Sequence, residues 1–343
     1  MLNFKEVKAE LSTPKKIIII PHKTPDADAL GSSLGLRAYL VKKEHQVTVI
    51  SPTSYPEFLN WMEGNDTVVI YNAGNLEKYK GMIDTADIVF CLDFNNLSRI
   101  DELGEMVKHS NAKKFVIDHH LDPQCFADFS FISTDASATA ELIYEFIVKM
   151  GDRELIDKSI AECLYAGIMT DTGQFKHNNT HQNVHFVTAN LMELGADTPK
   201  VASLIYDTNS YDRLKFLGFA LSQRLKFLPD YHTAYIAINA DDLKKFNSKT
   251  GDTEGLVNYA LSLEGAVLGV LISERDGEIK LSMRSKGDFS VNDFARKHFN
   301  GGGHKNAAGG SSDTSFDDTV QKFEEIIRTY KDELNQIADE YKL

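Results

Sequence analysis

One carboxylate and two imidazoles stand together in the sequence as Asp118-His119-His120. They come directly after Phe115-Val116-Ile117, an apolar run that is typical of a buried strand. Open α/β sheets bind their ligands at the carboxyl ends of strands, so the triplet occupies a position suited to chemistry. By itself the triplet is weak evidence, because polar residues after a strand are more often turn or cap residues.

Three further apolar elements, at residues 17–20, 88–92 and 160–169, also lead into carboxylates. The candidate residues that follow them are His22, Asp26, Asp28, Asp93 and Asp171. Aspartate is a favoured helix N-cap, which explains one or two such carboxylates but not one behind every element. The pattern therefore indicates a shared site.

The donor types of this site predict its metal. The six candidate metal ligands are His22, Asp26, Asp28, Asp93, His119 and Asp171. Two imidazoles and four carboxylates suit Mn²⁺ or a similar divalent ion better than a thiolate-bound metal. One octahedral ion could use all six ligands, but Asp26-Ala27-Asp28 places two carboxylates on one turn, each directed towards its own metal. We therefore predict two ions roughly 3.5–4 Å apart, with Asp93 as the shared ligand and a bridging hydroxide as the nucleophile.

The remaining polar residues of the triplet are expected to have other roles. Adjacent residues of an extended segment point in opposite directions, so His120 is not expected to share the role of His119. Its imidazole either contacts a non-bridging phosphate oxygen or hydrogen-bonds to the backbone, and the sequence leaves both open. Asp118 is expected to orient or polarise a ligand rather than to bind metal.

A second group of candidate residues lies nearer the C-terminus. Gly301-Gly302-Gly303 precedes His304 and a stretch of small residues. The backbone N–H groups of such a loop can approach an anion closely, as they do at a helix N-terminus, where we expect this loop to lie, and His304 adds a donor. Arg284 and Ser285 end a candidate strand, where a bidentate contact between arginine and phosphate is natural. We favour phosphate binding here; the alternatives are a flexible linker and an exposed arginine without a role.

The composition limits the class of protein. The chain has 343 residues, of which 42% are hydrophobic and 25% charged, as expected for a globular protein with room for two domains. The net charge of −13 argues against a surface that binds long duplex nucleic acid, although a small anionic substrate fits if metal ions reverse the local field. The three cysteines, Cys91, Cys125 and Cys163, are interpreted as reduced core residues. Because no apolar segment is long enough for a bilayer and the N-terminus has no signal-peptide core, we expect a cytoplasmic protein without a membrane partner.

Strand and helix patterns alternate up to about Gly195, which predicts a mostly parallel sheet with helices on both faces. The expected strands are 16–20, 46–50, 87–92 and 114–117, and the expected helices are 27–42, 137–149, 158–169 and 181–194. Further on, the patterns predict strands at 234–238, 266–273 and 279–283 and one final helix.

We therefore predict an α/β protein of two domains. Residues 1–196 are the catalytic domain, 197–228 a helical connector and 229–343 a smaller α/β domain, with the active site in the cleft between the domains. The final helix carries apolar residues at helical spacing from Phe316 to Ile337. We expect this stripe to pack within its own domain; a homodimer contact is the alternative.

Taken in order, these motifs resemble those of the DHH/DHHA1 phosphoesterases over nearly the whole chain. The motifs that carry the resemblance are His22-x3-Asp26-x-Asp28-x2-Gly31-Ser32, Asp93, Asp118-His119-His120, Thr170-Asp171-Thr172-Gly173 and Gly301-Gly302-Gly303-His304-x-x-Ala307-Ala308-Gly309. The length and layout are similar to the stand-alone group of nano-RNases and 3′-phosphoadenosine-5′-phosphate phosphatases. That group also includes cyclic-di-AMP and pApA phosphodiesterases.

The resemblance implies which residues bind each metal ion and which contact the substrate. It implies His22, Asp26 and Asp93 on one Mn²⁺, and Asp28, Asp93, His119 and Asp171 on the other. It also implies that His120 lies near the scissile phosphate and that Arg284 and the loop from Gly301 to His304 hold the far phosphate or nucleotide. Arg99 falls where such relatives have an arginine.

The expected function is hydrolysis of short oligoribonucleotides, dinucleotides of the pApA type or 3′-phosphoadenosine-5′-phosphate. The alternatives are a cyclic-di-AMP phosphodiesterase, an exopolyphosphatase, an inorganic pyrophosphatase, a long-strand exonuclease and a non-catalytic nucleotide sensor.

Overall fold

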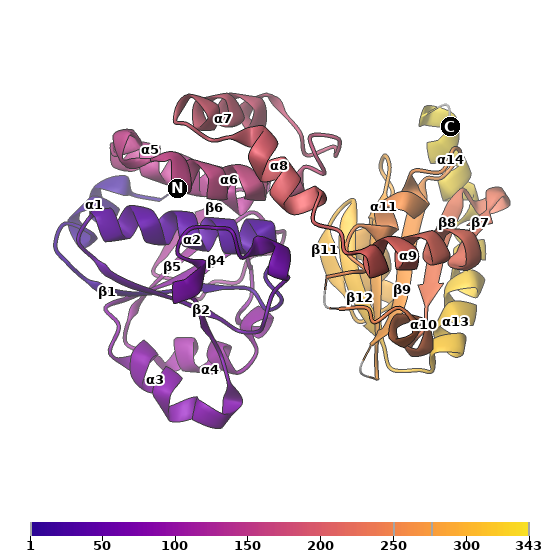
Figure 1. The fold of residues 1–343 in the computed structure, drawn as a ribbon, viewed down its shortest axis with the longest axis horizontal. Helices are drawn as coiled ribbons and strands as arrows, with labels where there is room; N and C mark the ends of the chain where they lie inside the picture. The colour runs from indigo at the N-terminus through magenta and orange to yellow at the C-terminus, as the bar shows by residue number, and fades with distance from the viewer. Residues whose placement is uncertain (1, 250, 276, 342–343) are drawn as a thin grey trace. The chain divides into compact units, whose positions relative to one another are not determined.

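The computed structural model describes residues 2–249, 251–275 and 277–341. The chain divides into two compact units, Met1–Thr208 and Asn209–Leu343. Each unit is built around one six-stranded sheet (Figure 1).

The first unit contains a parallel sheet with the strand order β3-β2-β1-β4-β5-β6. Its strands are β1 (Lys16–Pro21), β2 (Gln46–Ser51), β3 (Val69–Ile70), β4 (Ile88–Leu92), β5 (Lys113–Asp118) and β6 (Phe129–Ile132). The order reverses direction between β1 and β4, which is the switch point of a doubly wound sheet. Loops diverge there at the carboxyl ends of the strands and leave room for a site.

Helices cover both faces of this sheet (Figure 1). The helices of this unit are α1 (Phe4–Glu10), α2 (Ala27–Lys42), α3 (Leu76–Asp84), α4 (Glu102–His109), α5 (Thr139–Met150), α6 (Lys158–Asp171), α7 (Gln182–Glu193) and α8 (Thr198–Tyr206), of which α7 and α8 pack on α6. Alternation along β1 explains the two layers, since successive side chains of a strand point to opposite faces. Ile17 and Ile19 pack in the core that α2, α5 and α6 share, whereas Ile18 and Ile20 pack with residues of α3 and α4.

Helices α2 and α6 lie very close together because a glycine stands at their contact. A Cβ on Gly31 would lie 2.4 Å from the Cys163 carbonyl oxygen, so no larger residue fits there. This contact brings the start of α2 beside α6, and both helices carry residues predicted to bind metal.

The second unit contains a mixed sheet with the order β11-β12-β10-β9-β8-β7, in which β8 and β9 pair in parallel and the other neighbouring strands pair antiparallel. The strands are β7 (Leu225–Leu228), β8 (Thr233–Ile238), β9 (Leu268–Arg275), β10 (Glu278–Ser285), β11 (Gly302–His304) and β12 (Ala307–Ser312). The helices are α9 (Tyr211–Phe219), α10 (Ala240–Lys245), α11 (Leu256–Leu261), α12 (Val291–His298), α13 (Phe316–Arg328) and α14 (Lys331–Tyr341). One face of the sheet packs with α9, α10 and α11 and the other with α12, α13 and α14.

The two-domain α/β class expected from the sequence is confirmed, but the last helix is not one helix. It divides at Thr329, whose hydroxyl donates to the Ile326 carbonyl oxygen at 2.7 Å. This side-chain hydrogen bond competes with the backbone hydrogen bonds that would continue the helix. Phe323, Ile327 and Leu334 are buried in the core of the second unit, so the stripe packs within its own unit as expected. A homodimer stays a prediction.

The structure divides the segment 197–228, which we expected as a connector. Val201 and Ile205 of α8 pack in the core of the first unit, whereas Phe216 of α9 packs in the second. The boundaries 1–196, 197–228 and 229–343 stay a prediction.

Two smaller expectations can be compared with the structure. Cys91 and Cys163 are buried as expected, but Cys125 is exposed in the loop between β5 and β6, so its assignment to the core was wrong. Among the described residues, no helix has the length and apolar character required to cross a membrane.

Candidate metal and active site

The predicted ligands of the first unit meet at the switch point of its sheet. His22 follows β1, Asp93 follows β4 and His119 follows β5. Asp26 caps α2 and Asp28 lies in its first turn, while Asp171 is the last residue of α6. The parallel strands therefore deliver residues that are far apart in sequence to one edge.

His22 and Asp26 are each held with one polar atom turned towards the site. The His22 ring nitrogen Nδ1 lies 2.8 Å from the Lys23 carbonyl oxygen, which can only accept, so Nδ1 donates and Nε2 faces the carboxylates. Asp26 accepts the backbone N–H groups of Asp28 and Ala29 on Oδ1, both at 3.0 Å. Its Oδ2 lies 3.9 Å from His22 Nε2.

The candidate ligands form two clusters with Asp93 beside both. In one, the ligand atoms of His22, Asp26 and Asp93 all lie within 4.8 Å of one another. In the other, the same holds for Asp28, His119 and Asp171. We call these the His22 cluster and the His119 cluster.

Asp93 turns one carboxylate oxygen to each cluster. Its Oδ2 lies 3.3 Å from His22 Nε2, and its Oδ1 lies 3.4 Å from His119 Nε2. The backbone of Asp93 has φ +65°, an uncommon conformation for a residue other than glycine and one that is often found at functional sites. The turn after β4 thus aims this carboxylate between the two imidazoles.

His119 is oriented in the same way as His22. Its Nδ1 lies 3.2 Å from the Ala136 carbonyl oxygen and donates to it. Its Nε2 lies 3.2 Å from Asp171 Oδ2 and 3.9 Å from Asp28 Oδ2. Both imidazoles therefore present Nε2 to carboxylates, the arrangement in which a neutral imidazole binds a metal.

The charges of this buried group oppose one another. Burial alone would lower the pKa of His22, but Asp93 and Asp26 raise it to about 8. Burial, together with the negative charges of Asp93 and Asp171, raises the pKa of Asp28 well above its usual range. Burial also disfavours the charged form of Asp93, yet its contacts with His119 and His22 hold the pKa of Asp93 well below its usual range. Buried carboxylates that repel one another beside imidazoles fit a divalent cation, which would compensate their charge.

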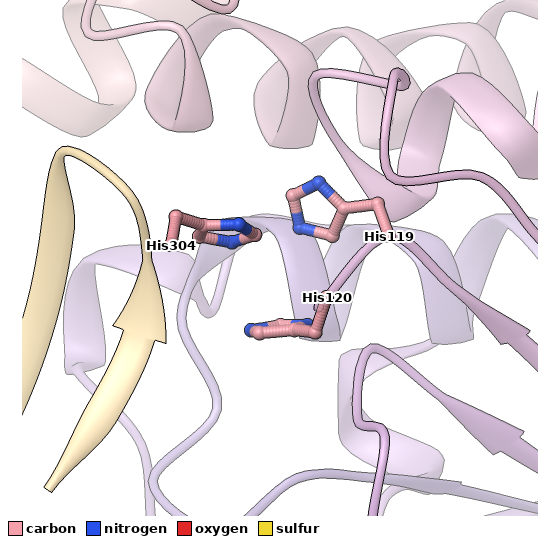
Figure 2. A group of neighbouring side chains, drawn as sticks. All are labelled: His119, His120 and His304. Atoms are coloured by element: carbon pink, nitrogen blue, oxygen red, sulfur yellow. The ribbon is translucent and has the colours of Figure 1, made fainter. Parts of the chain in front are cut away.

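His120 and Asp118 form a pair beside the His119 cluster. The ring planes of His119 and His120 are 76° apart at the end of β5 (Figure 2). His120 Nδ1 lies 2.8 Å from Asp118 Oδ1, so its partner is a side-chain carboxylate, which neither of the two readings left open by the sequence named. Asp118 is fully buried and orients His120, whose catalytic role stays a prediction.

Arg99 lies close enough to the His22 cluster to act on it electrostatically. It belongs to a short 3-10 helix, Leu97–Ile100, and its carbonyl oxygen accepts from the Lys23 N–H at 2.8 Å. Its positive charge is one of the effects that lower the pKa of His22. A substrate contact by Arg99 stays a prediction.

In the second unit the glycine cluster is a hairpin, not a loop at a helix N-terminus. Gly301 follows α12, and β11 and β12 pair with Gly302 opposite Gly309. A Cβ on Gly301 would lie 2.1 Å from the Gly309 carbonyl oxygen, so this glycine is required for close packing. The Gly303 N–H already donates to Asn292 Oδ1 at 2.9 Å. The expectation of a helix N-terminus was therefore wrong.

The same hairpin brings Arg284 and His304 onto one row. Ala307 pairs with Arg284 of β10 on one side and with His304 of β11 on the other. Residues directly opposite in antiparallel strands point to the same face, so the side chains of Arg284 and His304 share a face of the sheet. Ser285 does not offer its hydroxyl to this face, since it donates to the Phe289 carbonyl oxygen at 2.6 Å and accepts from Asn306.

Our interpretation of the sequence missed the residues at the start of α5. Thr139 and Ala140 donate hydrogen bonds to Asp28, and Thr139 also donates to Asp93. A threonine at a helix start is so common that a single sequence contains no signal for this role.

The fold and the site together define a class: a two-unit α/β protein with histidine and aspartate clusters at the switch point of a parallel sheet. Two family models match the chain: "DHH family, N-terminal domain" over residues 16–168 and "DHHA1 domain" over residues 230–336.

Relatives of known name cover most of the chain. It is 30% identical over 315 residues to the "Probable bifunctional oligoribonuclease and PAP phosphatase NrnA" of Streptococcus mutans, which spans 91% of this chain and 94% of that protein. It is 29% identical over 307 residues to the "Bifunctional oligoribonuclease and PAP phosphatase NrnA" of Bacillus subtilis, which spans 89% and 92%. An exopolyphosphatase-related protein from Bacteroides fragilis has a crystal structure that superimposes with a TM-score of 0.91, at 37% identity and 97% coverage of both chains.

The chain belongs to the DHH/DHHA1 family. The resemblance inferred from the motifs is confirmed, and so is the class of enzyme, a hydrolase acting on phosphate ester bonds.

Proposed function

We propose that this protein is a manganese-dependent phosphoesterase that cleaves short oligoribonucleotides, dinucleotides of the pApA type or 3′-phosphoadenosine-5′-phosphate. One observation carries the proposal: Asp93 presents a different carboxylate oxygen to each of two clusters of metal-binding side chains. The names of the Streptococcus and Bacillus relatives support this choice of substrate class.

The residues divide between two ion sites. His22, Asp26 and Asp93 would hold one ion, and Asp28, Asp93, His119 and Asp171 would hold the other. Two such ions would polarise the scissile phosphate and lower the pKa of a bound water. A hard set of oxygen and nitrogen donors favours Mn²⁺ for both positions.

The other polar residues bind the substrate. His120, held by Asp118, donates to a non-bridging oxygen of the scissile phosphate. Arg284 and His304, which share a face of the second sheet, bind another phosphate of the substrate. Arg99 adds positive charge beside the His22 cluster. The net charge of −13 disfavours a long nucleic acid as the substrate.

The test is a panel of substrates with the purified, Mn²⁺-loaded protein. The panel contains a 5′-phosphorylated short oligoribonucleotide, pApA, 3′-phosphoadenosine-5′-phosphate, cyclic-di-AMP, polyphosphate and pyrophosphate. We expect release of mononucleotide or phosphate from the first three, blocked by a chelator. Asp93→Asn is expected to abolish turnover while the circular dichroism spectrum stays that of the wild type, because asparagine tolerates the same backbone conformation.

Several outcomes would contradict the proposal. Preferred turnover of cyclic-di-AMP, polyphosphate or pyrophosphate would assign the site to a different reaction of phosphate esters or anhydrides. Retained activity in Asp93→Asn would remove Asp93 from its central position. Nucleotide binding without any turnover would favour a sensor.

A further inference from the structure

A segment outside all of the sequence motifs contacts the elements that carry the metal ligands. Thr139 and Ala140 are the first two residues of α5, which follows β6 along the chain. Thr139 and Ala140 are fully buried. They donate hydrogen bonds to Asp28, in the helix that follows β1, and to Asp93, which follows β4.

Thr139 makes two of these contacts by itself. Its hydroxyl donates to Asp93 Oδ1 at 2.8 Å, and its backbone N–H donates to Asp28 Oδ2 at 2.7 Å. The N–H of Ala140 donates to the other oxygen of Asp28, Oδ1, at 2.8 Å. The first turn of α5 therefore fixes the rotation of the Asp28 carboxylate through two N–H groups. It also donates one hydroxyl hydrogen bond to the Asp93 carboxylate.

We propose that Thr139 is a positioning residue of the metal site: its hydroxyl sets the rotation of the Asp93 carboxylate, so that each oxygen faces its own ion. The inference rests on the proposed function, because it concerns the binding of the two ions. It adds a residue that lies outside the predicted ligand set and outside every motif of the family resemblance.

The geometry around Asp93 explains why one hydroxyl matters. A carboxylate can only accept, so the Thr139 hydroxyl must donate to Oδ1 and occupies one of its lone pairs. The other lone pair of Oδ1 then remains for the His119 cluster, while Oδ2 faces His22. Without the hydroxyl, the carboxylate could rotate and present both oxygens to one cluster.

The start of α5 is itself held firmly. Glu141 Oε2 accepts from the backbone N–H of Ser137 at 2.8 Å and from its hydroxyl at 2.9 Å. Asn179 donates to the carbonyl oxygens of Ser137 at 3.1 Å and Asp171 at 3.3 Å. The first turn of α5 is thus tied to Asp171 as well, and Thr139 has a fixed frame from which to orient Asp93.

The test compares a substitution that removes the hydroxyl with one that keeps it. Thr139→Val fills the same volume without a donor, whereas Thr139→Ser keeps the donor and loses a methyl group. Both keep the backbone N–H that contacts Asp28. Thr233→Val is the matched control, since Thr233 is also fully buried and donates to a carbonyl oxygen, that of Tyr231, in the second unit.

The readout is Mn²⁺ affinity, measured by calorimetric titration of the metal-free protein, together with the Mn²⁺ dependence of activity. We expect Thr139→Val to weaken Mn²⁺ binding about 10-fold or more, as loss of a residue that supports a ligand commonly does. Its activity should recover at high Mn²⁺ concentration. Thr139→Ser and Thr233→Val should bind Mn²⁺ like the wild type.

The outcomes separate this inference from the proposed function. Equal Mn²⁺ affinity of Thr139→Val and the wild type would overturn the inference alone, because a role in packing would be all that remains. Absence of Mn²⁺ binding by the wild type would overturn the proposed function and the inference with it. If Thr139→Val fails to fold, Thr139→Ala replaces it. We expect Thr139→Ala to lose Mn²⁺ affinity to the same extent.

Discussion

Gly167 of α6 gives a prediction whose size follows from the geometry. A Cβ at this position would lie 2.6 Å from Asp28 Oδ1, which is 0.8 Å short of the 3.4 Å at which ordinary contact begins. It would also lie 2.8 Å from the Cβ of Ala140. Gly167→Ala therefore inserts a methyl group beside the hydrogen bond that joins Asp28 to the start of α5.

Two opposing effects set the change in the free energy of unfolding. Overpacking a dense core costs about 1–3 kcal/mol, and contacts this short to two neighbours place the cost near the upper end. Replacing glycine by alanine within a helix raises the free energy of unfolding by about 1 kcal/mol. The net loss is about 2 kcal/mol, which corresponds to a decrease in melting temperature of about 4–8 °C for a unit of this size.

The assay is thermal unfolding in a chelator and again in excess Mn²⁺. We expect the lower melting temperature in the chelator and a smaller stabilisation by Mn²⁺ than in the wild type, because Asp28 is displaced from the His119 cluster. Gly81→Ala in α3 is the control: no atom lies within 4 Å of its added Cβ, so this variant should gain about 0.5–1 kcal/mol. A Gly167→Ala protein that melts at or above the wild-type temperature and gains the full stabilisation from Mn²⁺ would refute the reasoning.

Three further predictions concern other parts of the molecule. Asp118→Asn weakens the support of His120 without removing a ligand, so kcat at saturating Mn²⁺ should fall about 10–100-fold with little change in Mn²⁺ affinity; an unchanged kcat would contradict this. Arg284→Ala should mainly raise KM in steady-state kinetics, because a substrate contact that is equal in the ground and transition states contributes only to binding, and unchanged kinetics would remove Arg284 from the site. Burial acts to raise the pKa of Asp152, but the Lys43 ammonium, 2.8 Å away, and a tyrosine hydroxyl outweigh it and lower the pKa. Its ionised form therefore stabilises the fold above about pH 4, and this contribution is lost as the pH falls through the lowered pKa. The difference in melting temperature between wild type and Asp152→Asn should shrink below that pH, and a constant difference would exclude the pair.

The regular elements of the first unit could be predicted where the sequence pattern is strong. The helix expected at 27–42 is α2, because Asp26 caps it and a run of small and apolar residues follows, most of them buried. Strands β1, β4 and β5 contain apolar runs and are followed by His22, Asp93 and His119. Strand β3 was missed because two residues cannot show a period.

The candidate ligands could be found because a carboxylate follows each of four apolar elements, but the residues that support these ligands could not be found from the sequence. The hydroxyl of Thr139 matters through a contact with Asp93 that spans 46 residues of sequence. The glycines near 301 were assigned to a loop because consecutive glycines let backbone N–H groups approach an anion, whereas here Gly301 is required by the close approach of Gly309 in a hairpin. Such contacts depend on the packed fold, and a local pattern does not contain them.

The central claim is that Asp93 lies between two metal ions. The most direct measurement is a crystal structure of the Mn²⁺-loaded protein with an anomalous difference map recorded at the manganese absorption edge. The proposal predicts two peaks, one beside His22 and Asp26 and the other beside His119 and Asp171, with a carboxylate oxygen of Asp93 turned to each. A single peak, or peaks that do not contact Asp93, would contradict it.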